Sequence, residues 1–164
     1  MRRSTLVWAA AAALAALVAG TSVASAQSPA GMKLHVFSSG ALTVPKSLLQ
    51  SGAENTQIQV PVGFFVVRHP KGNVLFDTGN NDKIITDPSY WGPFIKGLNP
   101  VRTPDVAIDR QLAKIGLKPD DIQYVVVGHF HLDHGGNVGK FPNSTIVAGH
   151  ARGHLRVGGV HQHQ

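Results

Sequence analysis

Cysteine is absent from the 164-residue sequence. This absence excludes disulfides, thiolate metal sites and a cysteine nucleophile. The chain also has no run of Lys or Arg interleaved with aromatic residues, so its formal charge of +6 gives little support for nucleic-acid binding. Charged residues make up 15% and hydrophobic residues 43% of the chain, a balance typical of a globular protein rather than a disordered one.

Acidic residues are missing after Asp133, and residues 150–164 differ from the rest in composition. This segment has no convincing apolar period, and we interpret it as an atypical tail that follows a frame change or a premature end. The alternative is that its histidines act as substitute ligands, because His-rich tracts bind metals. Those histidines are His150, His154, His161 and His163.

A long hydrophobic run occurs only near the N-terminus. Arg2 and Arg3 precede an apolar run at 6–20, and small residues at 24–26 fit a signal peptidase site. Because the run is too short for a comfortable bilayer span, we expect residues 1–26 to be a cleaved signal peptide. An uncleaved anchor is the alternative. Cleavage would leave a net charge of +4, no stable membrane anchor and a periplasmic or secreted protein.

The rest of the chain alternates apolar runs with turn residues and one helical pattern. Runs at 33–38, 57–68 (interrupted at Pro61), 74–76, 122–127 and 145–148 predict strands. The second and third of these strands flank a Pro/Gly turn and so predict a hairpin. Segments 39–56 and 80–102 are predicted as loops, the second with an aromatic tip. The class is therefore α+β.

One helix is predicted at 105–116. Thr103 is its expected N-cap and Pro104 its first helical residue. Ile108, Leu112 and Ile115 form one apolar face, and a glycine at 116 is a natural C-terminal stop.

A cluster of histidine and aspartate follows the run at 122–127. His129, His131, Asp133 and His134 are four potential metal ligands within six residues. Alternation sends His129 and His131 to one side, where they can share an ion, while Asp133 and His134 can reach a second position. Imidazole with carboxylate suits zinc, and also iron or manganese. Two such ions about 3.5–4 Å apart could hold a hydroxide that attacks a substrate carbonyl.

The His-x-His-x-Asp-His pattern at 129–134 resembles the signature of the metallo-β-lactamase superfamily. Segments 61–79 (PVGFFVVRHPKGNVLFDTG), 105–116 and 118–122 fit the family in the same order. The resemblance implies the N-terminal half of an αβ/βα sandwich, with a partial domain at 27–149. The Leu-Phe-Asp-Thr-Gly and His-Leu-Asp-His-Gly-Gly-Asn segments are most similar to N-acyl-homoserine lactonases, which open the lactone ring of quorum-sensing signals.

The resemblance also implies residue roles. His129 and His131 would bind the first ion, and Asp133 and His134 the second, with Asp133 also orienting the attacking water. Asp77 would hold a ligand histidine, or else only cap its turn. Gly128 stands where relatives usually carry Ser or Thr. The cofactor would be two zinc ions, with Fe, Mn or Co as alternatives.

The resemblance implies a metal-dependent lactonase-like hydrolase acting on a small lactone or ester. Relatives carry a further His, a bridging Asp and a final His that this sequence lacks, so we expect a truncated chain. The alternatives are an inactive remnant or a non-enzymatic periplasmic metal binder. An exposed half-sandwich would favour a homo-oligomer. The substrate-binding residues are unknown, although Tyr90, Trp91 and Phe94 are candidates for lining an apolar entrance.

Overall fold

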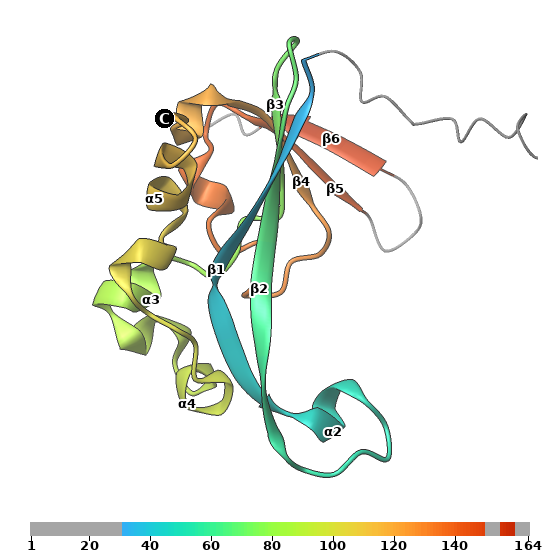
Figure 1. Ribbon diagram of the computed structural model, residues 1–164, viewed down its shortest axis with the longest axis vertical. Helices are drawn as coiled ribbons and strands as arrows, with labels where there is room; N and C mark the ends of the chain where they lie inside the picture. The colour runs from blue at the N-terminus through green and yellow to red at the C-terminus, as the bar shows by residue number, and fades with distance from the viewer. Residues whose placement is uncertain (1–30, 150–154, 160–164) are drawn as a thin grey trace, which may run out of the picture. The chain divides into compact units, whose positions relative to one another are not determined.

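The computed structural model describes residues 31–149 and 155–159 (Figure 1). The expected signal peptide and the four tail histidines lie outside these residues. A six-stranded sheet has its strands in sequence order. The strands are β1 Lys33–Pro45, β2 Gln57–Arg68, β3 Asn73–Phe76, β4 Ile122–Val127, β5 Thr145–Gly149 and β6 Leu155–Gly159. The α-helices are α2 Lys46–Leu49, α3 Lys83–Thr86, α4 Phe94–Leu98 and α5 Ile108–Ala113. The 3-10 helices are η1 Pro88–Trp91, η2 Pro104–Val106, η3 Pro119–Asp121 and η4 Val138–Lys140.

Strands β1 and β2 form a long antiparallel ribbon. The prediction of a loop from residue 39 was wrong, because β1 continues to Pro45 after a bulge between Ser38 and Ala41. A bulge lets a strand continue past a glycine, although the glycine interrupts the alternation of apolar and polar residues from which the strand was predicted. Pro61 does not interrupt β2 either. It pairs with Ala41, and β3 pairs only with the stretch Phe65–Val67, so the missing N–H of Pro61 costs no ladder bond to β3.

The predicted hairpin is present, and the strands after it run parallel. Strand β2 pairs antiparallel with β3, and β3 pairs parallel with β4, which in turn pairs parallel with β5. The carboxyl ends of β3 and β4 therefore lie side by side. Strand β6 returns antiparallel to β5, within the segment where no strand was expected.

Helices α3, α4 and α5 lie on one side of the sheet, whereas α2 lies at the end of the β1–β2 ribbon and buries no residue (Figure 1). Ile108 and Leu112 of α5 are fully buried against Phe64, Leu75 and Val125 of the sheet. The predicted single helix at 105–116 is in fact the turn η2 followed by the six-residue α5. The two are separate because Ala107 is extended, with ψ of 135°. Helix α5 ends at Ala113, three residues before the predicted stop, and Gly116 has a left-handed φ of +68° in the turn that follows.

The segment predicted as a long loop contains α3, η1 and α4. Trp91 is buried with Leu42, Val62 and Ile84 in a second apolar cluster beneath the β1–β2 ribbon. Sequence patterning missed these elements because each is only four or five residues long. In the described part of the chain, no helix is long and apolar enough to cross a membrane.

Candidate functional site

The candidate site lies where β3 and β4 end side by side. Strand β3 is followed by Asp77, and β4 by Gly128 and the histidine cluster. Asp77 N–H donates to the carbonyl of Val126 at 2.8 Å, and Thr78 N–H donates to the carbonyl of His134 at 2.7 Å. These bonds tie the turn after β3 to the end of β4 and to the segment that follows it, with Thr78 and His134 lying 56 residues apart in the chain.

Three imidazoles of the motif crowd together. The ring centroid of His129 lies 4.4 Å from that of His131 and 4.0 Å from that of His134. The carboxylate of Asp133 lies 3.5 Å from Nε2 of His134. All four residues predicted as ligands thus lie on the loop after β4, with His131 and His134 beside His129 and with Asp133 beside His134.

Asp77 supports this cluster through both of its carboxylate oxygens. Oδ1 accepts from the N–H of Gly128 at 2.8 Å, and Oδ2 lies 2.8 Å from Nδ1 of His134. A carboxylate only accepts, so Nδ1 carries the proton and Nε2 keeps its lone pair when the ring is neutral. Asp77 has a left-handed φ of 57°, a conformation rare for residues other than glycine and found at strained functional positions.

The glycine pair after the motif has a packing role. A Cβ on Gly136 would collide with the backbone of Asn81 and Gly79, and would lie 2.7 Å from the carbonyl of Leu132. Gly135 is less restricted, because its Cβ would meet only the Phe130 ring closely, at 3.2 Å. Glycine is therefore required at position 136 by the close approach of two backbone segments.

The sequence analysis missed a polar network beneath the motif. The buried Asn137 donates from Nδ2 to the carbonyls of Thr78 at 2.9 Å and Asn80 at 2.6 Å. Thr78 Oγ1 accepts from the N–H of Asn137 and donates to the carbonyl of His134. The sequence signal that could have found these residues was their position. They follow the two strand ends closely and lie within or next to the Asp-Thr-Gly and Gly-Gly segments.

The network continues to the start of α5 through Asp82. Its carboxylate accepts from the N–H of Ile108 and from Nζ of Lys140 at 2.7 Å. Lys140 also pairs with Asp109 at 2.6 Å. Burial lowers the pKa of Lys140, but hydrogen bonds to Asp109 and Asp82 outweigh this and raise the pKa above its ordinary value.

Two hollows border the motif. The smaller, of about 200 Å³, is lined by Tyr90, Trp91 and Leu132 together with His131. The larger, of about 710 Å³, reaches Asp77 and His134. Of the three predicted entrance residues, Tyr90 and Trp91 line the smaller hollow and Phe94 does not.

The family profile described as the metallo-beta-lactamase superfamily matches residues 59–158, which include both strand ends and the whole motif. The chain belongs to the metallo-beta-lactamase superfamily.

Within this superfamily the chain is similar to N-acyl homoserine lactonases. It is 36% identical over 118 residues to AttM of Azorhizobium caulinodans, covering 71% of this chain and 45% of AttM. It is 28% identical to AiiA of Bacillus thuringiensis subsp. kurstaki, covering 70% of this chain and 47% of AiiA. The chain therefore spans about half the length of the curated relatives that it matches.

A solved structure gives the same picture. An N-acyl homoserine lactone hydrolase with N-hexanoyl-L-homoserine at its catalytic metal centre aligns with a TM-score of 0.62 and 28% identity. The alignment covers 71% of this chain and 48% of that one.

The chemical types of the donor groups at this site suit a divalent metal ion. Imidazole nitrogen and carboxylate oxygen are zinc ligands, and the carboxylate of Asp77 behind His134 is the partner that ligand histidines commonly have. Within residues 31–149 and 155–159, however, no group of three or more His, Asp or Glu side chains is placed to hold an ion at once. The described residues thus provide suitable donor groups but do not form a complete metal-coordination site.

Proposed function

We propose that this chain is a metal-dependent hydrolase that opens the lactone ring of N-acyl homoserine lactones. The observation that carries the proposal is the convergence of three imidazoles at the end of β4, with Asp77 bonded to His134. The similarity to AttM and AiiA supports the choice of substrate.

A divalent cation held by His129, His131, Asp133 and His134 would polarise the lactone carbonyl and make water nucleophilic at neutral pH. Zinc is the cation we propose.

The chain's own residues have distinct tasks. Asp77 accepts a hydrogen bond from Nδ1–H of His134 and so fixes the orientation of the ring. This leaves the lone pair of Nε2 available to bind a metal ion. Asp133, 3.5 Å from that Nε2, is placed to accept a proton from water and orient it. Tyr90 and Leu132 line the hollow beside His131, and we propose that this hollow receives the apolar acyl group.

The test is hydrolysis of N-hexanoyl homoserine lactone by the purified chain loaded with zinc. We expect acid release that a chelator stops and that His131→Ala abolishes. His69→Ala is the matched control, because His69 lies in the β2–β3 turn away from the motif, and it should keep the full rate. Turnover that survives His131→Ala would contradict the assignment.

A second candidate function is metal binding without turnover. It is favoured by the incomplete donor set among the described residues. Here zinc titration calorimetry would show binding that His131→Ala weakens, while lactone hydrolysis stays at the uncatalysed rate. Measured together, binding and rate separate the two candidates.

We also propose export through residues 1–26. Arg2 and Arg3, the apolar run and the small residues at 24–26 support a cleaved signal peptide. N-terminal sequencing of the exported protein should begin at Gln27. A chain that keeps residues 1–26 in the membrane fraction would contradict cleavage.

A further inference from the structure

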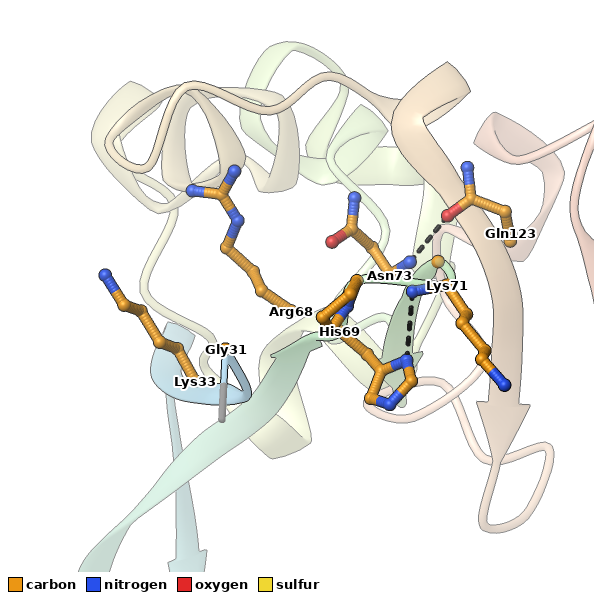
Figure 2. A pocket seen from close by; sticks show the side chains of 9 residues that line it. Gly31, Lys33, Arg68, His69, Lys71, Asn73 and Gln123 are labelled. Atoms are coloured by element: carbon orange, nitrogen blue, oxygen red, sulfur yellow. Dashed lines mark hydrogen bonds between the residues drawn. The ribbon is translucent and has the colours of Figure 1, made fainter. Parts of the chain in front are cut away.

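A separate cavity lies at the opposite end of β3 and β4 from the histidine motif. Its volume is about 690 Å³. Lys33 at the start of β1, Arg68 at the end of β2 and Lys71 in the hairpin turn border it. In Figure 2, Lys33 and Arg68 extend on one side of His69, and Lys71 extends on the other. The residues that line the cavity do not overlap with the candidate site.

Two of these cations are held in an unfavourable arrangement. Lys33 and Arg68 pair directly across the β1–β2 ladder, so their side chains leave the same face of the sheet. Like charges directly opposite one another destabilise a sheet. Among the described residues, neither cation has a carboxylate within ion-pair distance, and nor does Lys71. An anion between the strands would remove this repulsion.

The remaining polar groups of the cavity also present donors. Nδ1 of His69 accepts from the N–H of Lys71 at 3.1 Å, so the neutral ring carries its proton on Nε2. Oε1 of Gln123 accepts from the N–H of Asn73 at 2.5 Å, which leaves the Gln123 amide group as a donor (Figure 2). Arg68 donates one of its guanidinium N–H groups to the carbonyl of Ile115 at 3.3 Å. The described residues that line the cavity include no carboxylate.

We propose that this cavity binds a phosphate-type anion, either a free phosphate group or the headgroup of an anionic phospholipid. Guanidinium and ammonium groups with N–H donors are the usual ligands of phosphate oxygens. Among the described residues, no Phe, Tyr or Trp lines the cavity, so these residues provide no stacking surface of the kind with which proteins hold nucleobases. The phosphate group itself is therefore the part that is recognised.

The first experiment measures thermal unfolding of the metal-free chain in potassium phosphate and in potassium chloride of equal ionic strength. When the phosphate concentration is ten times the Kd, the melting temperature should rise by about 5 °C. Lys33→Gln should melt about 1–4 °C higher than the wild type in chloride, because the like-charge pair is gone. The same variant should lose most of the rise in phosphate. Lys96→Gln, on α4, is the matched control and should change neither value.

The second experiment measures binding without relying on unfolding. The chain is sedimented with vesicles of phosphatidylcholine alone and with vesicles that contain phosphatidylglycerol, and inorganic phosphate is titrated by calorimetry. Binding to phosphatidylglycerol vesicles without binding to inorganic phosphate assigns the cavity to a headgroup, and the reverse assigns it to a free anion. Either signal must weaken at least fivefold in Arg68→Gln. The proposal is overturned if neither probe binds, or if Arg68→Gln binds as tightly as the wild type. No lactone or metal is present, so this result is independent of the proposed hydrolase activity.

Discussion

Asp77 connects the two strand ends more directly than any other residue of the candidate site. One carboxylate oxygen accepts from the backbone of Gly128 and the other from the ring of His134. A Cβ on Gly128 would lie 3.4 Å from the same carboxylate, so the position could also carry a small side chain. The conformation of Asp77, with its φ of 57°, is thus fixed by contacts on both sides.

We expect Asp77→Asn to weaken zinc binding about 10–100-fold, as loss of the partner of a ligand histidine typically does. The amide is neutral, so it stabilises the orientation and basicity of His134 less than the carboxylate does. Competition with a chromophoric chelator measures the affinity. Asp120→Asn is the control, because it changes an exposed carboxylate that contacts Lys118 and Asn143 rather than a residue of the motif. Equal affinities for Asp77→Asn and the wild type would refute this role.

Gly136 allows a separate prediction at the residue scale. Gly136→Ala forces backbone against backbone, because the added Cβ meets main-chain atoms of Gly79 and Asn81. We expect a loss of about 3 kcal/mol in the free energy of unfolding, measured with urea. Gly139→Ala is the matched control, because a Cβ there meets nothing within 4 Å, and it should change stability little. Similar losses for the two variants would show that the close approach is not the cause.

At the scale of elements, the position of α5 depends on residues outside it. The helix has six residues, and the side chain of its N-cap residue, Ala107, cannot accept a hydrogen bond from the first turn. Asp82 supplies the cap from a distance of 26 residues by accepting from the N–H of Ile108. Lys140, on η4 after the motif, then bonds Asp82 and Asp109 together. The helix and the motif loop are therefore held by one set of charges.

We expect Lys140→Met to reduce the free energy of unfolding by about 1–2 kcal/mol, since the lysine is partly exposed. The raised pKa of folded Lys140 means that this contribution is complete below the unfolded value of 10.5. It is lost as the pH rises through the higher folded pKa. Urea unfolding between pH 8 and 11.5 should therefore show the wild type converging on the variant at high pH. A constant gap across this range would contradict the ion-pair explanation, and Lys96→Met serves as the control.

At the scale of the whole described unit, the sheet has one bare face. Helices cover one side, while the other presents cross-strand apolar pairs such as Val36 with Phe65 and Phe65 with Phe76. Val36 is 67% exposed and Phe65 is 40% exposed. A groove of about 330 Å³ runs across this face, and Leu34 and Val126 also line it. Contiguous apolar surface of this kind favours association.

We expect the purified chain to associate with rising concentration in sedimentation velocity experiments. The double variant Phe65→Thr with Phe76→Thr should shift the chain toward monomer, because threonine keeps strand propensity and removes apolar area. Leu48→Thr with Leu49→Thr, on exposed leucines of α2, is the control. A wild-type chain that stays monomeric at all concentrations would contradict the prediction.

Much of the fold could be predicted because short-range patterns determined it. The run at 122–127 became β4 with the predicted bounds, and the turn after Arg68 made the predicted hairpin. Ile108 and Leu112 are buried as their spacing indicated. The continuation of β1, the division of the helix at Ala107 and the strand β6 escaped prediction, because a bulge, a distant cap and strand pairing determine them.

The sequence by itself determined which chemistry is available: it carries imidazole and carboxylate donors, no thiol, and a motif placed directly after a buried strand. Only the tertiary structure decided that Asp77 reaches His134 and that Lys33 stands opposite Arg68. The physical reason is that residue types and local periods are set along the chain. Contacts between residues about 57 apart are set by which strands pair and in which register.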